Sequence, residues 1–549
     1  MRTGLLIAAF LAALAPPAAV AADPAVVYQT QPVGRLLDEA RAAANSMGGQ
    51  RAVKEFNAEI KRALGEKGFD GVDINRPIVG YVDIPADPMN AVAVVALPVT
   101  GEKEFLAFCE RWNNVKPKPL KGGLYEVPAL GPGLKAVVRV TDGYAYIATG
   151  TSDPARVLDA KTLVPAATLY DPTETALMTG RVYFDRIPAE VRAKITDLSA
   201  LMKASLLTLS ADTGEAAKKA LGEFVKLGTR YLELGKGAKE AAVRVTYDPE
   251  AGDLTAEATL TAVPGSPLAN ELAARKSKPH RFAALVTPDA VMASVARLPF
   301  FEPELREAAV IGLDRLRDEA KNGPAQPRAM FDEILKGLIR TVKTDEVDFA
   351  YVLRGPAKDG TFSGVVAVSF DDPSGVEKEL KKVVEAELPP EFKDALKWDA
   401  AKAGGVSIHT LTLTKLGGFT AGVQRLFGED ATVAVAFAPK AVYVAVGPDA
   451  VATITAAMAA KPGDAPGLSS VVNPARMTKF MAATETQPGN AGKAARVWGT
   501  EDKLLSVMSL AVGGEKELKL KLGVNLKLYG RAALLGGAGV GPDDEPEAK

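Results

Sequence analysis

The residue types that most often carry chemistry are scarce in this chain of 549 residues. It contains two histidines and one cysteine. A zinc site needs several histidine, cysteine or carboxylate ligands at close spacing, and no such cluster surrounds His280, His409 or Cys109. The sequence also has no Gly-x-Ser-x-Gly nucleophile motif and no phosphate loop that ends in Gly-Lys-Ser/Thr. We therefore predict no catalytic, metal-binding or cofactor-binding residues, and we favour a protein without enzymatic activity.

The two histidines and the cysteine have structural interpretations that we favour over reactive ones. His409 lies in the alternating stretch 407–413, which predicts a strand residue that faces solvent. His280 lies in the basic stretch 275–281, which we interpret as a solvated joint between domains, although it could also bind an anionic partner. Cys109 shares one face of a predicted helix with three aromatic residues, so we expect a packed core cysteine.

The acidic residues do not form a recognisable ligand set. The group Asp70, Asp73 and Asn75 lacks the spacing of a calcium loop. Asp371 and Asp372 precede a predicted helix, where they are expected to act as caps with Ser374. Paired carboxylates of a hydrolase could still converge, but only through the fold.

Composition excludes two classes of partner. The chain has 66 basic and 67 acidic residues, and the two signs are interspersed. A surface for nucleic acid or for an anionic membrane normally needs a basic excess, so we expect neither partner. The apolar share of 47% is typical of a globular protein.

The N-terminus predicts export. Arg2 precedes the apolar run 5–14, and the small residues 19–22 offer a cleavage site, so residues 1–22 are interpreted as a signal peptide. No later segment approaches the roughly 20 apolar residues that span a bilayer. We expect a mature protein in the periplasm or outside the cell, with no transmembrane segment after signal removal.

The elements that would position any site occur twice along the chain. Alternating hairpins are predicted at 135–150 and 431–447, and aligning their turns pairs Tyr146 with Tyr443 and Gly150 with Gly447. The predicted strands 77–84 and 91–99 correspond to 347–354 and 362–370. The other elements that we expect are a helical region at 33–64; helices at 102–112, 187–198, 221–231, 305–316, 331–342 and 376–388; strands at 26–28, 281–286 and 406–413; and closing hairpins at 243–260 and 504–528.

From this repetition we predict an α+β protein of two similar domains, each an antiparallel sheet with helices packed on one face. The expected boundaries are a signal peptide at 1–22, a first domain at 23–275, an internal duplicate at 276–532 and a disordered tail at 533–549. The glycine-rich run 537–541 lacks the following helix of a dinucleotide-binding unit.

The signal peptide, the duplicated plan and the phrases Gly-Leu-Tyr-Glu-Val (123–127) and Asp-Gly-Tyr-Ala-Tyr (142–146) resemble those of long exported bacterial proteins of unknown function with a duplicated α+β unit. The resemblance implies no activity and no functional residues. Our leading hypothesis is a non-enzymatic binding or interaction protein of the cell envelope, whose partner is an unknown protein or an apolar ligand. The alternatives are a hydrolase whose carboxylates converge in a cleft between the domains, and a carrier of an apolar ligand.

Overall fold

The fold is taken from a computed structural model of the chain. The structure describes residues 23–87, 90–113, 115–128, 135–151, 153–192, 215–274, 279–299, 302–321, 325–344, 346–387, 390–416, 420–484, 498–499, 501–513 and 517–535. Within these ranges, no helix is both long and apolar enough to cross a membrane.

The chain forms two compact units, and neither unit is one continuous stretch of sequence. Unit 1 contains residues 1–200, 231–276 and 513–530, and unit 2 contains 201–230, 277–512 and 531–549. The predicted second domain, 276–532, therefore gives its last strand to unit 1. Two helices, α6 (Glu215–Gly235) and α16 (Leu526–Leu535), have residues in both units.

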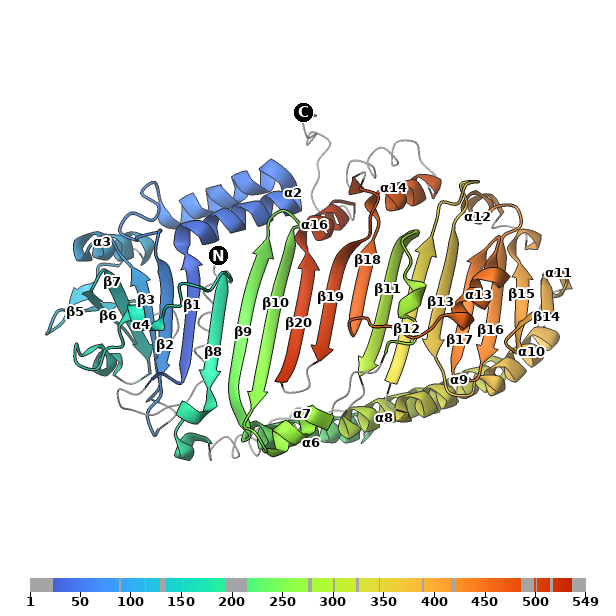
Figure 1. Ribbon diagram of the computed structural model, residues 1–549, viewed down its shortest axis with the longest axis horizontal. Coiled ribbons are helices and arrows are strands. Elements are labelled where there is room, and N and C mark those ends of the chain that lie inside the picture. Colours follow the sequence, from blue (N-terminus) through green and yellow to red (C-terminus); the bar gives the residue numbers. More distant parts are fainter. Residues whose placement is uncertain are drawn as a thin grey trace. The chain divides into compact units, whose positions relative to one another are not determined.

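Unit 1 is built on an antiparallel sheet whose strands lie side by side in the order β4, β5, β6, β7, β3, β2, β1, β8, β9, β10 and β20 (Figure 1). The hairpin predicted at 135–150 is confirmed as β6 and β7, with Asp142 and Gly143 at positive φ in its turn. The strand bounds are β1 Val26–Pro32, β2 Pro77–Asp83, β3 Val92–Pro98, β4 Lys118–Pro119, β5 Leu124–Val127, β6 Lys135–Thr141, β7 Tyr144–Gly150, β8 Met178–Tyr183, β9 Ala238–Asp248, β10 Asp253–Ala262 and β20 Glu517–Asn525.

Unit 1 also contains helices, of which α2 is the longest. The predicted helical region is confirmed as α2 (Val33–Leu64), which contains non-helical backbone at Gly48 and Gly49. Arg41 Nε donates a hydrogen bond to Asn57 Oδ1 across 16 residues, a separation of about 24 Å in a straight helix. The second half of α2 must therefore fold back along the first. The other helical segments are α3 Glu102–Asn113, η2 Pro154–Leu158, α4 Ala166–Leu169, η3 Phe184–Arg186 and α7 Pro267–Ala274.

Unit 2 is also built on an antiparallel sheet, with the strand order β14, β15, β16, β17, β13, β12, β11, β18 and β19. The hairpin predicted at 431–447 is confirmed as β16 and β17. The strand bounds are β11 Ala290–Pro299, β12 Glu346–Arg354, β13 Ser363–Ser369, β14 Leu396–Ala403, β15 Val406–Thr412, β16 Thr432–Ala438, β17 Ala441–Gly447, β18 Leu468–Val472 and β19 Leu505–Gly513.

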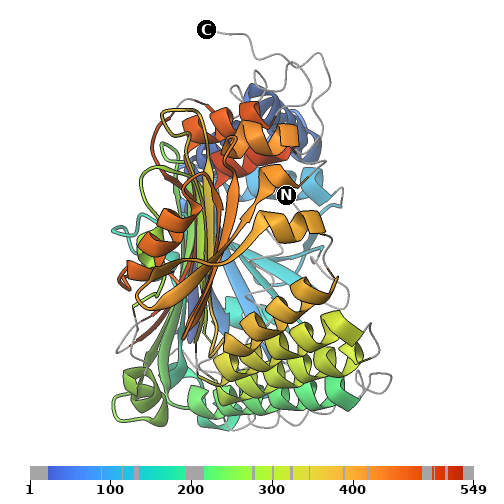
Figure 2. The same ribbon diagram turned by 90° about the vertical axis from the view of Figure 1, so that its right-hand side faces the viewer.

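Helices cover both faces of the unit 2 sheet, so the prediction of helices on a single face is wrong. On one face, Ala450, Ile454 and Ala457 of α13 pack into the core formed by β12, β13, β16 and β17. On the other face, α9 contacts β12 through a cluster with Ile339 and Val342 (Figure 2). The helical segments are η4 Ala283–Leu285, α8 Pro303–Ala320, α9 Ala325–Lys343, α10 Ser374–Glu387, α11 Pro390–Ala395, η5 Leu413–Lys415, α12 Thr420–Phe427, α13 Ala450–Ala459 and α14 Pro474–Ala483.

Two predicted elements differ from the structure, and part of a third lies outside the described residues. The strand predicted at 281–286 is wrong: residues 283–285 form a short 3-10 turn, and the strand is β11, because a short apolar run does not distinguish a strand from a turn packed into the core. The last strand ends at Asn525 rather than at Leu528, since Asn525 Oδ1 accepts the main-chain N–H of Leu528 where helix α16 begins. The second half of the helix predicted at 187–198 lies outside the described residues.

Candidate functional site

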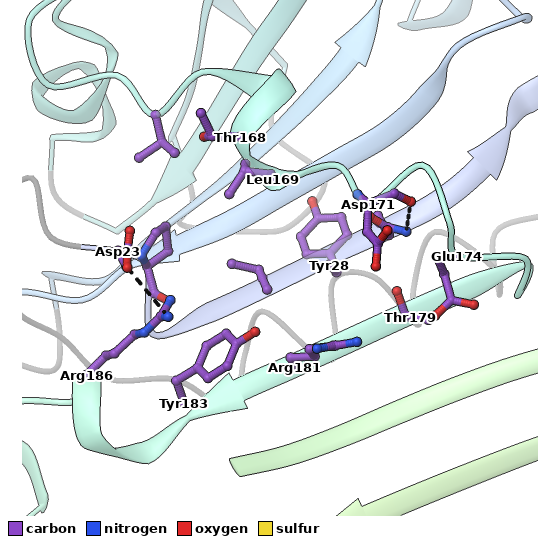
Figure 3. A pocket seen from close by; sticks show the side chains of 14 residues that line it. Asp23, Tyr28, Thr168, Leu169, Asp171, Glu174, Thr179, Arg181, Tyr183 and Arg186 are labelled. Atoms are coloured by element: carbon purple, nitrogen blue, oxygen red, sulfur yellow. Dashed lines mark hydrogen bonds and ion pairs between the residues drawn. The ribbon is translucent and has the colours of Figure 1, made fainter. Parts of the chain in front are cut away.

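A pocket of about 310 Å³ opens on the unit 1 sheet (Figure 3). Val27 lies opposite Arg181 and Gln29 lies opposite Thr179 in the pairing of β1 with β8. Because alternate residues of a strand share a face, these four side chains point to the same side of the sheet. The pocket is lined by Asp23, Pro24, Val27, Tyr28, Gln29, Val164, Thr168, Leu169, Asp171, Glu174, Thr179, Arg181, Tyr183 and Arg186.

Two buried glutamines of β1 hold the wall of the pocket in place. Gln29 Nε2 donates to the carbonyl of Asp171 at 3.2 Å, and its Oε1 accepts the N–H of Asp171 at 2.7 Å. Gln31 Nε2 donates to the carbonyl of Glu174 at 2.7 Å. Both glutamines are only 7% exposed. The segment from Asp171 to Glu174 is therefore fixed by hydrogen bonds that need no ligand.

The two carboxylates at this wall are already satisfied. Asp171 accepts hydrogen bonds from the hydroxyl and the N–H of Thr173, which hold the pKa of Asp171 below its usual range. Burial by itself would raise the pKa of Glu174, but hydrogen bonds from Arg244 and from the N–H of Ala176 hold it below the ordinary value. Both groups are therefore ionised at neutral pH and accept protein donors.

The two arginines of the pocket differ in how firmly they are held. Arg186 lies 3.9 Å from the ring centre of Tyr183, donates to the carbonyl of Pro24 and pairs with Asp23 at 3.6 Å. The contact of Arg181 is with Glu240 at 4.0 Å, the outer limit of an ion pair, and its side chain is 45% exposed. Figure 3 shows Arg181 on the floor of the pocket between Tyr183 and Thr179. Arg181 is therefore more exposed and less firmly held than Arg186, and it is the arginine of this site that can more readily bind a ligand.

Apolar and aromatic side chains complete the pocket. Val27, Val164 and Leu169 contribute hydrocarbon. Burial raises the pKa of the Tyr28 phenol well above its usual value, so this hydroxyl stays protonated. The combination can hold a ligand that has an apolar body and one anionic group.

Comparisons of the chain with protein-family models, with curated proteins and with solved structures give no match.

His409 is not the solvent-facing residue that its strand pattern predicts. It is 3% exposed, and its ring lies 4.9 Å from that of Trp398. Nδ1 accepts the N–H of Asp399, so the proton resides on Nε2, which donates to Glu377 at 3.1 Å. Burial, together with Lys381, lowers the pKa of His409, which is therefore neutral at pH 7. The predicted strand is confirmed as β15, but helix α10 covers the face that we expected to be exposed to solvent.

His280 is also buried, at 1% exposure, so the interpretation of a solvated residue at a joint is wrong. Its Nδ1 accepts the N–H of Phe282, and its Nε2 lies 3.8 Å from Asp348. Asp348 in turn forms an ion pair with Arg297 at 2.8 Å and accepts the N–H of Arg281. This network ties the start of unit 2 to β11 and β12. Residues 275–278 of the basic stretch lie outside the described residues.

The remaining sequence candidates have structural roles. Cys109 is 7% exposed in the core under α3, as predicted, and burial raises its pKa to about 11. Asp372 accepts hydrogen bonds from Ser374 at the start of α10, as a cap should. Asp73 accepts the N–H of Asn75 in a turn, and Asp70 lines a second groove. Across the described ranges, no three His, Cys, Asp or Glu residues are grouped so as to hold a metal ion.

Sequence reasoning missed the pocket of unit 1. One signal was present: Gln29 and Gln31 follow Val27 at alternate positions, so a strand here places two amide groups on the same face as an apolar side chain. A buried amide needs hydrogen-bond partners, so this pattern predicts a loop packed over β1. It does not predict which loop, because Asp171 lies 142 residues away.

Proposed function

We propose that this protein is an exported, non-enzymatic binding protein of the cell envelope that holds a small organic anion in the pocket of unit 1. One observation carries the proposal: Arg181 lines the pocket with a side chain that is 45% exposed and an ion pair as long as 4.0 Å, whereas Asp171 and Glu174 accept hydrogen bonds from Thr173 and Arg244. A carboxylate or phosphate of the ligand would pair with Arg181. Its apolar part would contact Val27 and Leu169.

Binding is a better account of this pocket than hydrolysis. A general acid at neutral pH needs a pKa raised toward 7. Asp171 and Glu174 have pKa values that are lowered, and their oxygens accept hydrogen bonds from Thr173 and Arg244. Neither carboxyl group holds a proton to donate at pH 7.

We also propose that the two units descend from one duplicated α+β unit. The support is the strand order, which is the same in both sheets. Unit 1 has β4, β5, β6, β7, β3, β2, β1, β8 and β9 side by side, and unit 2 has β14, β15, β16, β17, β13, β12, β11, β18 and β19 in the corresponding places. The registers also correspond, since Ala96 lies opposite Tyr146 and Ala367 lies opposite Tyr443. Matched order and matched register are expected of a copied unit, because a shift of one residue would turn every side chain to the other face.

This correspondence supports a ligand-related role for Arg181. In the matched registers, Gln29 corresponds to Val295 and Arg181 corresponds to Val471. Both valines pack in the apolar core of unit 2. The same sheet position can thus be filled by hydrocarbon, so the fold does not itself require an arginine there.

Calorimetric titration of the full chain tests the proposal with hexanoate and benzoate, each compared with its neutral amide. We expect the acids to bind and the amides to bind at least about 10-fold more weakly, because a hydrogen bond to a charged group contributes about 1.5–3 kcal/mol. Arg181→Gln should abolish this preference. Arg62→Gln, which removes an exposed arginine paired with Glu59 on α2, is the matched control. Equal binding of acid and amide, or an unchanged preference in Arg181→Gln, would contradict the proposal.

A further inference from the structure

A second groove, of about 760 Å³, lies in unit 1 among α2, the segment 67–74 and α3. Helix α3 packs on Val138 and Ala145, whereas the first pocket shares its face with Val79 and Tyr146. Since alternate residues of a strand point to opposite faces, the groove and the pocket lie on opposite sides of the sheet. Four cations and two carboxylates are among the residues that line the groove: Arg41, Lys67, Lys103, Arg111, Asp70 and Glu104.

Among the described residues, three of these cations have no carboxylate partner. Neither Lys67 nor Lys103 has a carboxylate oxygen within 4.0 Å there. Arg111 donates from Nη2 to the main-chain carbonyl of Asp70 at 2.6 Å and forms no ion pair within the same part of the chain. Arg41 differs, since it pairs with Asp38 at 2.8 Å. Since Arg41 is balanced by Asp38, and the carboxylates of Asp70 and Glu104 line the groove with Lys67, Lys103 and Arg111, the lining keeps a small excess of positive charge.

The walls that carry these cations are held firmly together. Gly71 has a φ of 105°, and a Cβ added to it would lie 2.4 Å from the carbonyl oxygen of Glu104. Only glycine permits this approach, which fixes the segment that carries Lys67 against the first turn of α3, where Lys103 lies. The N–H of Thr100 also donates to the carbonyl of Gly71. The spacing of the main-chain segments that carry the two lysines is therefore set before any ligand binds.

Apolar side chains lie beside the positive charge. Leu37, Phe69 and Ile74 line the same groove, and Ile74 is 37% exposed. Phe69 stacks on Phe108 of α3, with the ring centres 6.5 Å apart. A ligand that joins a compact anion to an apolar group would match both parts of this surface.

We propose that this groove binds a phosphomonoester that carries an apolar group. Lys67 and Lys103 would act as point charges on the phosphate oxygens, and the planar guanidinium of Arg111 would bind two of those oxygens. The ligand is either a soluble phosphorylated molecule or the headgroup of an anionic lipid, which share this chemistry. The inference does not depend on the first pocket, because no residue lines both sites.

The test is titration of the full chain with phenyl phosphate and with inorganic phosphate, followed by calorimetry. We expect phenyl phosphate to bind more tightly than inorganic phosphate, and the double variant Lys67→Gln/Lys103→Gln to bind phenyl phosphate about 10- to 100-fold more weakly. The control with the same net charge is Lys54→Gln/Lys239→Gln, which changes two exposed lysines outside the groove and should bind normally. Because phenyl phosphate could also enter the first pocket, the comparison is repeated in an Arg181→Gln background. There Lys67→Gln/Lys103→Gln should still weaken phenyl phosphate binding by the same factor, which separates this site from the first pocket.

Sedimentation with vesicles distinguishes the two sources of the phosphate. Binding to vesicles of 20% phosphatidic acid in phosphatidylcholine, absent for pure phosphatidylcholine and lost in Lys67→Gln/Lys103→Gln, identifies a lipid headgroup. Binding of phenyl phosphate without vesicle binding identifies a soluble ester. The proposal is overturned if the native chain binds neither probe, or if the groove variant and the lysine control weaken binding equally.

Discussion

Tyr28 and Gly80 lie opposite each other on β1 and β2, and their contact permits a sharp test of the packing. A Cβ added to Gly80 would lie 2.2 Å from the ring of Tyr28. We expect Gly80→Ala to destabilise this strand pair by about 1–3 kcal/mol, the usual cost of overpacking a core. The loss should appear although alanine is intrinsically better than glycine in a strand by about 0.5–1 kcal/mol.

The effect of Gly80→Ala on stability should change sign when the ring of Tyr28 is removed. In a Tyr28→Ala background, Gly80→Ala meets no clash and is expected to stabilise the strand pair by up to about 1 kcal/mol. The double-mutant cycle should therefore give a coupling energy of about 1–4 kcal/mol between the two positions. Under the proposed duplication, this pair corresponds to Ser294 and Tyr351 of unit 2, where the tyrosine lies on the other strand of the pair. The double swap Tyr28→Ser/Gly80→Tyr should accordingly be more stable than Gly80→Tyr alone.

Hydrogen exchange of peptides from residues 77–83 is the appropriate assay. A chain with two compact units does not unfold in one step, so a single free energy of unfolding would mix the two units. Exchange of the β2 amides reports the local opening free energy. Peptides from β12 in unit 2 serve as the internal control and should not change. If Gly80→Ala leaves β2 exchange unchanged, or costs as much with Tyr28 absent, the packing argument is wrong.

Two further predictions concern charged groups. Because the folded-state pKa of Glu174 is lowered, its stabilisation is complete above the unfolded pKa of about 4.3 and is lost as the pH falls through the lower folded value. Glu174→Gln should cost about 1 kcal/mol at pH 7 and progressively less below pH 4, as measured by exchange of β8 amides over a pH series; a constant difference would contradict this. In unit 2, Asp348 is 4% exposed and forms an ion pair with Arg297. Because Asp348→Asn would leave the charge of Arg297 buried without its partner, it should destabilise β11 and β12 by about 3–5 kcal/mol. A cost similar to that of the exposed Arg62→Gln would refute the buried-pair interpretation.

Apolar periodicity and turn residues in short stretches of sequence were enough to predict most of the helices and strands. The Asp142-Gly143 turn with alternation on both sides predicts β6 and β7, and the period of Val53, Phe56 and Ile60 predicts the second half of α2. The burial of Cys109 likewise followed from its place on one helical face. These features depend on residues within a few positions of one another, so a single sequence contains the necessary information.

The sites were decided by contacts between distant parts of the chain. The pocket exists because β1 pairs with β8 and because Gln29 binds the main chain of Asp171, 142 residues away. His409 is buried because α10 lies over its strand, and His280 because Asp348 reaches it from β12. Alternation in a strand specifies that one face differs from the other, but it does not specify which distant segment covers either face. That choice depends on strand order and loop packing, which only the tertiary structure determines.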